Sequence, residues 1–480
     1  MLFPIASHSG IAIAAGGGRL MSYRELEGEA SEFAKAGGGR APALMLCRNS
    51  PGMIACYAGF ISSGIVPIML GEHAAFDAVM EILRRYRPSL IACPGDLQVL
   101  SEGRDGAGRP PFGGVEVEKA LELDGVSVFR TGLGDPPDLH PDLALLLSTS
   151  GSTGSPKLVR ISKKNLESNA ASIIESLGIT ADDRAITALP MNYSYGLSVI
   201  NTRLMAGGSL AATDSSLMQK PFWDLFEKAG ATSLSGVPYS YAMLRRLGFC
   251  RSAHPRLCMM DQAGGRLPEA LQQEFSSYCA SEGIKFFLMY GQTEATARMA
   301  CLPSGLASSR LGCAGRAIPG GAFSVRGDDG SELGPWQEGR LFYKGPNVAM
   351  GYAFEAADLA LGDEWHGVLD TGDRAMLDEG GFLYLRGRSS RFVKLFGNRV
   401  GLDECAEMLE RRFPGTEAAC TGRDDLLVAC IAGDVDPAEA RAYLAASTRI
   451  HQSAFKVVKL KSLPRSPSGK ILYSKLPKAT

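Results

Sequence analysis

The apolar run at residues 143–147 is followed, at 148–157, by a segment of glycines, hydroxyl side chains and one lysine. The apolar run predicts a buried strand. Glycines let consecutive backbone N–H groups converge on an anion, hydroxyls add donors, and Lys157 adds a positive charge. A surface linker has a similar composition, but the strand before the segment argues against one. We therefore expect a polyphosphate-binding loop formed by Thr149, Ser150, Gly151, Ser152, Thr153, Gly154 and Lys157.

Strand-like and helix-like segments alternate around this loop and continue to about residue 310. Residues 43–47, 66–70 and 90–93 are typical of strands, and residues 76–85 of a helix. Residues 53–63 predict an amphipathic helix. Another helix begins after Ser22, which has Glu25 three residues later in a capping pattern. Such alternation predicts a parallel sheet with crossover helices.

The pattern changes after residue 312. Short β-like runs split by Gly and Asp fill residues 312–384 and predict a small β-rich subdomain. The last segment mixes a strand at 426–431 with helices at 402–411 and 437–446. We expect an α/β fold with an N-terminal domain over 1–388, made of parallel α/β sheets and the β-rich subdomain. A small α+β domain follows over 391–480.

Composition excludes several classes of protein. Fifty basic and fifty-one acidic residues leave a net charge of −1, so neither nucleic acid nor an anionic membrane is expected as a partner. Six scattered histidines predict no metal cluster. No apolar stretch approaches the ~20 residues of a membrane helix, and the N-terminus lacks signal-peptide features. Eleven cysteines without a Cys-x-x-Cys pair favour reduced thiols and a cytoplasmic location.

The loop and five further segments stand in the order found in the adenylate-forming superfamily of AMP-dependent synthetases and ligases. The superfamily includes acyl-CoA synthetases, peptide-synthetase adenylation domains and luciferase. The resemblance extends from residue 23 to residue 470. The further segments are residues 189–196, 289–295, 369–373, 387–400 and 463–471. Residues 262–268 resemble the segment that lines the adenine pocket, although Arg266 stands where a small residue or proline is expected.

The resemblance implies a nucleotide site. Tyr290, before Gly291, would stack on adenine, and the backbone of Gly264 and Gly265 would line that pocket. Asp373 would accept the ribose hydroxyls, and Arg388 would brace the ribose or a phosphate. Taken alone, Tyr290 also fits a core packing role, and the Asp-Thr-Gly-Asp turn also fits a structural role.

The resemblance also implies the catalytic residues. Thr293 offers a hydroxyl to a phosphate, and Glu294 offers a carboxylate to Mg²⁺, which prefers carboxylate and phosphate oxygens. Lys470 would reach the α-phosphate and the acid during adenylation. A lysine ten residues from the end of the sequence is otherwise a solvated charge. Here the flanking prolines and Ser-Gly predict a tight turn that projects it outward.

In the implied reaction, an acid attacks ATP, pyrophosphate leaves, and a thiol then takes the acyl group. Gly397 would line the thiol channel, so the acceptor is coenzyme A or the phosphopantetheine of a carrier protein. Coenzyme A is favoured, because standalone enzymes of this architecture are most often CoA ligases. Because the sequence contains no fused carrier, an acyl or peptidyl carrier protein would act in trans. Relatives rotate the small domain between the two steps. The hinge residue here is Ser390, where the family usually has Asp or Lys.

The acid pocket would include Tyr193, Tyr195, Gly196 and Met289. Residues 192–196 contain no carboxylate to pair with an ammonium group, which argues against an α-amino acid. Tyr193 replaces the histidine of many acyl ligases, and the Tyr-x-Tyr-Gly pattern is similar to benzoate-type ligases. We expect a flat aromatic or short aliphatic carboxylic acid as substrate, while Tyr193 also fits a plain packing role.

Alternatives remain. The chain could be a carrier-protein ligase, an enzyme whose adenylate is taken by an amine, or a non-catalytic nucleotide-binding protein. The last is disfavoured because every residue of the implied site is present. A Rossmann dehydrogenase and a protein kinase are excluded because their motifs are missing.

Overall fold

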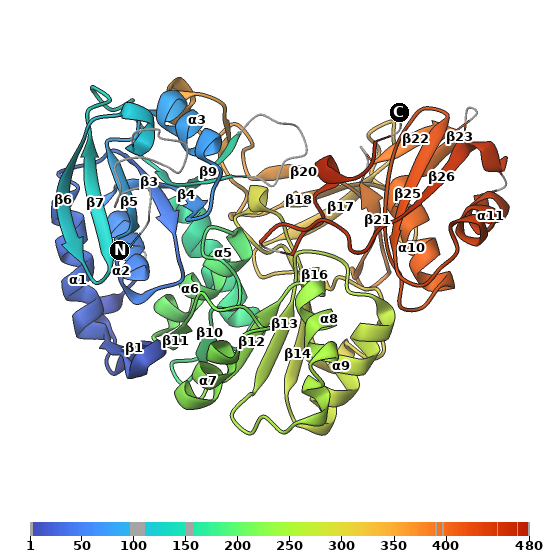
Figure 1. Ribbon diagram of the computed structural model, residues 1–480, viewed down its shortest axis with the longest axis horizontal. Coiled ribbons are helices and arrows are strands. Elements are labelled where there is room, and N and C mark those ends of the chain that lie inside the picture. Colours follow the sequence, from blue (N-terminus) through green and yellow to red (C-terminus); the bar gives the residue numbers. More distant parts are fainter. Residues whose placement is uncertain are drawn as a thin grey trace. The chain divides into compact units, whose positions relative to one another are not determined.

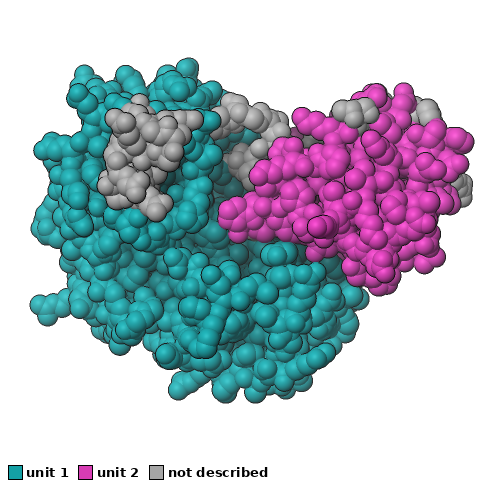
Figure 2. Space-filling view, viewed as in Figure 1, with its two compact units in different colours: residues 1–311, 315–322, 344–369 teal, residues 312–314, 323–343, 370–480 magenta. Residues whose placement is uncertain are grey.

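The computed structural model describes residues 3–96, 111–148, 157–388, 391–395, 398–448, 450–467 and 469–478. The chain divides into two compact units, shown in Figure 2. Unit 1 holds residues 1–311, 315–322 and 344–369, and unit 2 holds residues 312–314, 323–343 and 370–480. The domain boundary expected at 388–391 stays a prediction, and these compact units divide the chain at other positions.

Unit 1 contains an eight-stranded sheet in the order β19-β9-β8-β4-β3-β5-β7-β6 (Figure 1). Its four central strands, β8, β4, β3 and β5, pair in parallel as expected, and the flanking pairs are antiparallel. The strands are β3 (Pro42–Cys47), β4 (Val66–Gly71), β5 (Leu90–Pro94), β6 (Val117–Leu123), β7 (Val126–Thr131), β8 (Leu143–Ser148), β9 (Leu158–Ser162) and β19 (Gly351–Ala353).

Unit 1 also contains a nine-stranded sheet in the order β16-β15-β14-β13-β12-β10-β11-β1-β2. Its middle, from β14 to β1, is parallel. The strands are β1 (Ile11–Ala15), β2 (Leu20–Ser22), β10 (Arg184–Ile186), β11 (Ser209–Ala212), β12 (Ser233–Gly236), β13 (Met259–Gln262), β14 (Lys285–Tyr290), β15 (Ala300–Leu302) and β16 (Arg316–Ala317).

Helices of unit 1 cover these sheets, and Figure 1 shows α1 and α2 side by side. Ser22 caps α1 through the predicted capping box with Glu25. The amphipathic expectation for residues 53–63 is wrong, because ten consecutive residues of α2, 52–61, are buried. The helices are α1 (Tyr23–Ala36), α2 (Pro51–Ser63), α3 (Phe76–Tyr86), α5 (Lys163–Leu177), α6 (Ser194–Ala206), α7 (Lys220–Ala229), α8 (Pro238–Arg246) and α9 (Glu269–Ser281).

The reason for the burial of α2 is that it packs within the core that joins both sheets. Residues of α1, α2, α5 and α6 share one apolar cluster with strands of the two sheets. At its centre the Tyr57 hydroxyl of α2 donates to Asn201 Oδ1 of α6 at 3.1 Å. A helix that is surrounded by protein has no face to leave polar.

The described residues of unit 2 form three sheets and two helices. The four-stranded sheet consists of β17 (Ala322–Arg326), β18 (Gly339–Lys344), β20 (Val368–Leu377) and β21 (Leu383–Arg388). A β22 (Phe392–Leu395) and β23 (Asn398–Gly401) pair precedes α10 (Leu402–Arg412), and the third sheet joins β24 (Glu417–Arg423), β25 (Leu426–Ala432) and β26 (Phe455–Lys459) beside α11 (Pro437–Thr448).

These elements confirm the predicted fold class, a large α/β part followed by a smaller α+β part. One detail of the β-rich stretch at 312–384 differs from the expectation. Its strands β16 and β19 join the two large sheets of unit 1 rather than the four-stranded sheet. Within the described ranges, none of the helices has both the length and the apolar composition needed to cross a bilayer.

Candidate active site

Several predicted site residues lie outside the described residues. They are Thr149, Ser150, Gly151, Ser152, Thr153 and Gly154 of the loop, Ser390 of the hinge and Gly397 of the thiol channel. Lys157 is described and lies immediately before β9, so the predicted loop connects β8 to β9. The apolar run before the loop is β8, which confirms the predicted buried strand.

A lysine, a tyrosine and a glutamate form a connected row in unit 1. Lys157 Nζ lies 3.8 Å from the centroid of the Tyr352 ring, and the Tyr352 hydroxyl donates to Glu294 Oε1 at 2.9 Å. Tyr352 reaches Lys157 because β19 pairs with β9, with Tyr352 opposite Val159. The ring attracts the ammonium through its π face and the hydroxyl orients the carboxylate. The Tyr352 side chain therefore contacts both the Lys157 ammonium and the Glu294 carboxylate.

Thr293 and Glu294 lie in a short turn, residues Thr293–Ala295, just after β14. The segment before β19 holds this turn in place, because the Ala349 N–H donates to the Glu294 carbonyl at 2.9 Å. Thr293 Oγ1 lies 3.2 Å from Ser194 Oγ at the first turn of α6. Two hydroxyls therefore stand together beside the Glu294 turn, both suited to donating to phosphate oxygens.

Tyr290 is the last residue of β14 and is partly exposed, as a residue that stacks on a base should be. Gln292 Nε2 donates to its hydroxyl at 3.2 Å. The next residue has to be glycine: a Cβ on Gly291 would lie 1.8 Å from the Ala297 carbonyl oxygen. This close approach folds the chain back after β14 and presents Thr293 and Glu294.

Gly264 and Gly265 follow β13 and lie against other parts of the predicted pocket. Gly264 has φ +81°, and a Cβ there would come within 2.4 Å of the Tyr193 hydroxyl oxygen. Tyr193 thus occupies the space that the missing side chain leaves, and burial raises its pKa. At Gly265 a Cβ would lie 3.1 Å from Pro238 Cγ. The structure therefore brings the predicted adenine segment and Tyr193 of the predicted acid pocket into contact.

The other predicted pocket residues are packed in the core of unit 1. Tyr195 and Met289 are buried. Tyr195 donates to Asp261 Oδ2 at 2.7 Å, and burial raises its pKa well above its usual value. Gly196 sits in the first turn of α6, where a Cβ would lie 2.3 Å from the Pro190 carbonyl oxygen.

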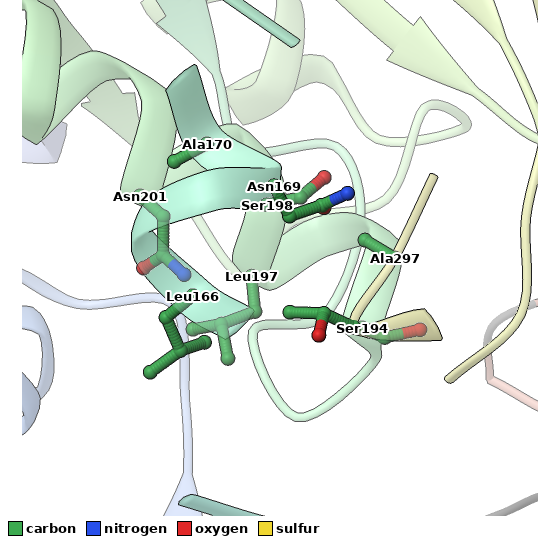
Figure 3. Close-up of a pocket in the computed structure, with 9 residues that line it drawn as sticks. Leu166, Asn169, Ala170, Ser194, Leu197, Ser198, Asn201 and Ala297 are labelled. Atoms are coloured by element: carbon green, nitrogen blue, oxygen red, sulfur yellow. The ribbon is translucent and has the colours of Figure 1, made fainter. Parts of the chain in front are cut away.

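Figure 3 shows a small cavity beside this region, between α5 and α6. Its volume is about 10 Å³, and its lining includes Ser194, Asn201 and Ala297. That volume suits about one water molecule. A carboxylic acid does not fit in this cavity, whose lining includes none of the four residues predicted for the acid pocket.

In unit 2, Asp373 of β20 and Arg388 of β21 stand directly opposite each other in the antiparallel register. Asp373 is buried, and its N–H donates to Thr371 Oγ1 at 3.1 Å after Gly372 at φ +70°. The two residues predicted to hold the ribose are therefore paired across neighbouring strands of one sheet. Only the backbone of Arg388 is described.

The segment around Lys470 forms the predicted tight turn. Gly469 has φ +77°, Ser466 N–H donates to the Lys470 carbonyl at 2.7 Å, and Lys470 N–H donates to Ser466 Oγ at 3.1 Å. Arg465 braces the turn through the Gly469 carbonyl and an ion pair with Glu417 at 2.9 Å. Lys470 itself is partly exposed at the end of the turn.

Three residues of this region were not predicted from the sequence: Tyr352, Ser194 and Asp261. Tyr352 lies far along the chain from Lys157 and Glu294, and only strand pairing brings it to them. Ser194 lies inside the segment 189–196, so its hydroxyl was the one signal available. Asp261 directly precedes the segment 262–268, and its burial is a property of the fold.

The donor set at Glu294 fits Mg²⁺. The described residues contain no cluster of three or more His, Cys, Asp or Glu side chains that could hold a metal ion. A single carboxylate with nearby hydroxyls is what Mg²⁺ requires when phosphate oxygens and water complete its shell. Glu294 would be the residue that holds it, with the Thr293 hydroxyl beside it for a phosphate oxygen.

Comparisons with known proteins identify the family of the chain. A family model described as "AMP-binding enzyme" matches residues 6–353. Indoleacetate–CoA ligase of Aromatoleum aromaticum is 28% identical over 480 residues, covering 94% of this chain and 92% of that protein. 2-Succinylbenzoate–CoA ligase of Bacillus thuringiensis is 29% identical over 343 residues, covering 69% of each.

Solved structures share the fold over nearly the whole chain. The o-succinylbenzoate CoA synthetase of Bacillus subtilis in complex with its acyl-adenylate intermediate has a TM-score of 0.78 at 22% identity, covering 98% of this chain and 96% of that one. ATP-bound MatB from Rhodopseudomonas palustris has a TM-score of 0.73 at 22% identity, covering 97% and 95%.

Proposed function

Since the AMP-binding enzyme model matches residues 6–353, the chain belongs to that family, and we propose that it is an acid–CoA ligase. The acid's carboxylate attacks the α-phosphate of ATP and pyrophosphate leaves. The thiol of CoA then attacks the carbonyl carbon of the acyl-adenylate, and AMP leaves. The observation that most supports this proposal is the row of Lys157, Tyr352 and Glu294 beside the hydroxyls of Thr293 and Ser194.

The first step brings two anions together, so catalysis rests on positioning and charge neutralisation. Lys157 would contact the β- and γ-phosphates, and the Thr293 hydroxyl would donate to a phosphate oxygen. Mg²⁺, held by Glu294, supplies charge neutralisation at the phosphates. Asp373 would accept the ribose hydroxyls. Lys470 would neutralise charge between the acid and the α-phosphate.

CoA is the proposed thiol because the two relatives named above are both CoA ligases. Both names also describe aromatic acids, which agrees with Tyr193 and Tyr195 in the predicted pocket. An aromatic carboxylic acid is therefore the proposed substrate class. Loading of a carrier protein in trans is the second candidate. The predicted thiol channel at Gly397 supports this candidate as much as it supports CoA, because both acceptors present a pantetheine thiol.

The proposed location is the cytoplasm. All eleven cysteines are free thiols in the structure, and nine of them are buried. A reducing compartment maintains thiols in that state.

The test is pyrophosphate release with ATP and Mg²⁺ against a panel of aryl, fatty and amino acids, with and without CoA. We expect release that depends on an aromatic acid and is accelerated by CoA. Lys470→Ala should reduce it about 100- to 1,000-fold, as removal of a charge-stabilising donor does. Lys475→Ala, five residues further on, is the matched control.

Release that CoA does not accelerate would favour a carrier protein or an amine as the acceptor. If no acid supports release while ATP still binds, the ligase proposal is wrong and the non-catalytic alternative holds.

A further inference from the structure

A buried polar cluster lies at strands β12 and β13 and on the inner face of α6. Its centre is Asp261, which is 1% exposed. Ser235 of the neighbouring strand donates to Asp261 Oδ1 at 2.6 Å, and Tyr195 of α6 donates to Oδ2 at 2.7 Å. Arg298 NH2 lies 3.2 Å from the same Oδ2 and is itself 1% exposed. Both oxygens of the carboxylate are thus occupied.

The Arg298 guanidinium is less well satisfied than the carboxylate. Its NH1 faces the sulfur of Met289 at 2.9 Å, and its Nε has no hydrogen-bond partner among the residues that the structure describes. The guanidinium carbon lies 4.7 Å from the centroid of the Tyr195 ring. A thioether is a weak acceptor, and a buried N–H without an acceptor is costly. Arg298 therefore has N–H donors, at Nε and NH1, without a strong acceptor.

The charges of the cluster do not balance either. Arg203, two turns after Tyr195 on α6, is 1% exposed, and its guanidinium donates to the hydroxyls of Thr202 and Ser233. Burial lowers its pKa to about 10, and Arg298 adds to that effect, while Asp261 and Asp183 oppose it. Asp261 is the one buried carboxylate within the described part of unit 1. Two buried guanidinium groups therefore share one buried carboxylate, whereas buried charges are normally paired.

This cluster adjoins the predicted acid pocket. Arg298 contacts Met289 and Tyr195, both of which the sequence analysis assigned to that pocket. Tyr193 packs edge-on against Tyr195, with 6.2 Å between ring centroids, and is partly exposed. Tyr193 therefore marks the solvent side of the cluster, and Arg298 lies at its inner end.

We propose that Arg298 is the residue that selects the acid, and that the substrate carries a second carboxylate at the end away from the reacting one. A second carboxylate supplies the acceptor that Nε lacks and a stronger acceptor for NH1 than the Met289 sulfur. It also supplies negative charge, since two buried guanidinium groups share one buried carboxylate. This inference rests on the proposed function and specifies its substrate class as aromatic dicarboxylic acids.

The experiment compares matched pairs of acids in the pyrophosphate-release assay. Suitable pairs are phenylacetate with 4-carboxyphenylacetate, and 3-phenylpropionate with 3-(4-carboxyphenyl)propionate. A site that hydrogen-bonds a substrate group strongly rejects the analogue that lacks it. Wild type should prefer the dicarboxylate by on the order of 100-fold in kcat/KM. In Arg298→Met that ratio should fall to about 1.

Two further variants keep the test interpretable. Arg245→Met replaces an arginine whose side chain is 47% exposed on α8 and should leave the ratio unchanged. Arg298→Lys keeps the charge but loses the planar fork, so its ratio should lie between wild type and Arg298→Met. If Arg298→Met does not fold, Arg298→Lys and the wild-type ratio alone decide.

Pyrophosphate release that shows no preference within the pairs overturns this inference and leaves the ligase proposal intact. A preference that persists in both Arg298 variants also overturns it. Absence of release with every acid rejects the ligase proposal itself, and this inference with it.

Discussion

Glu294 gains its orientation from residues remote in the sequence. Tyr352, 58 positions later, donates to its carboxylate, and the same ring lies against Lys157. One aromatic side chain therefore positions both a predicted metal ligand and a predicted phosphate ligand. The sequence shows the chemistry of Lys157 and Glu294, whereas their contacts with Tyr352 depend on the pairing of β19 with β9.

Tyr352→Phe should lower kcat/KM for ATP about 10-fold, because it removes one hydrogen bond to a charged carboxylate and keeps the ring beside Lys157. The loss should shrink as Mg²⁺ is raised, since a less oriented Glu294 binds the ion more weakly. Pyrophosphate release at several Mg²⁺ concentrations measures this. Tyr239→Phe, on the surface of α8, is the control, and equal losses in both variants would contradict the prediction.

Gly291→Ala should destabilise unit 1 by about 2 kcal/mol and abolish adenylation, because the new Cβ would lie 1.8 Å from the Ala297 carbonyl oxygen. Gly305→Ala adds the same atom where nothing lies within 4 Å and should be nearly neutral. Urea denaturation of both variants measures the difference. Similar midpoints for the two would show that the turn after β14 relaxes freely.

At the scale of elements, α10 and β24 are joined by a carboxyl group with an altered pKa. The Ala418 N–H of β24 donates to Glu410 Oε1 of α10 at 2.9 Å. Burial nonetheless raises the Glu410 pKa from 4.5 to about 7, helped by Glu417 and Glu407 and opposed by Arg465. Arg465 also braces the Lys470 turn, so this packing lies next to the proposed catalytic loop.

The folded state therefore holds the Glu410 proton more tightly than the unfolded state. The associated stability is complete below pH 4.5 and is lost as the pH rises through about 7. Its ceiling is about 3 kcal/mol. Glu410→Gln keeps an acceptor for Ala418 and should remove this loss, so it should exceed wild type in stability at pH 8.

Urea denaturation at pH 5.5 and pH 8 tests this prediction. Glu332→Gln, at an exposed position of unit 2, should retain the wild-type pH dependence. Parallel pH profiles for wild type and Glu410→Gln would show that Glu410 titrates normally.

At the scale of the whole molecule, the predicted site residues are divided between the two units. Lys157, Tyr290 and Glu294 belong to unit 1, whereas Asp373, Arg388 and Lys470 belong to unit 2. Adenylation and thioester formation use different reagents. We therefore propose that the last segment rotates between the two steps, with Ser390 as the hinge.

Ser390→Pro should separate the two steps, because proline fixes φ near −65° and blocks a rotation at that residue. We expect thioester formation to fall on the order of 100-fold while a single-turnover burst of pyrophosphate remains. Rapid-quench measurement of both products tests this, with Ser390→Ala as the control. Unchanged thioester formation in Ser390→Pro would place the hinge elsewhere.

The elements and the family were readable from the sequence, because both depend on local order. Strands at 43–47, 66–70, 90–93 and 143–147, and the capping box at Ser22, follow from hydrophobic period and side-chain chemistry, and the structure confirms them. The motif segments identified the family for the same reason: their residues are neighbours along the chain.

Tertiary structure alone determined which residues that are distant in the sequence come into contact. It buried α2 on all sides, opposed Asp373 to Arg388, laid Tyr352 between Lys157 and Glu294, and enclosed Arg298 with Asp261. Burial and long-range contact are set by how whole sheets and helices pack. A local pattern therefore carries the chemistry of a residue, and the fold determines the partners and the charge environment in which that chemistry acts.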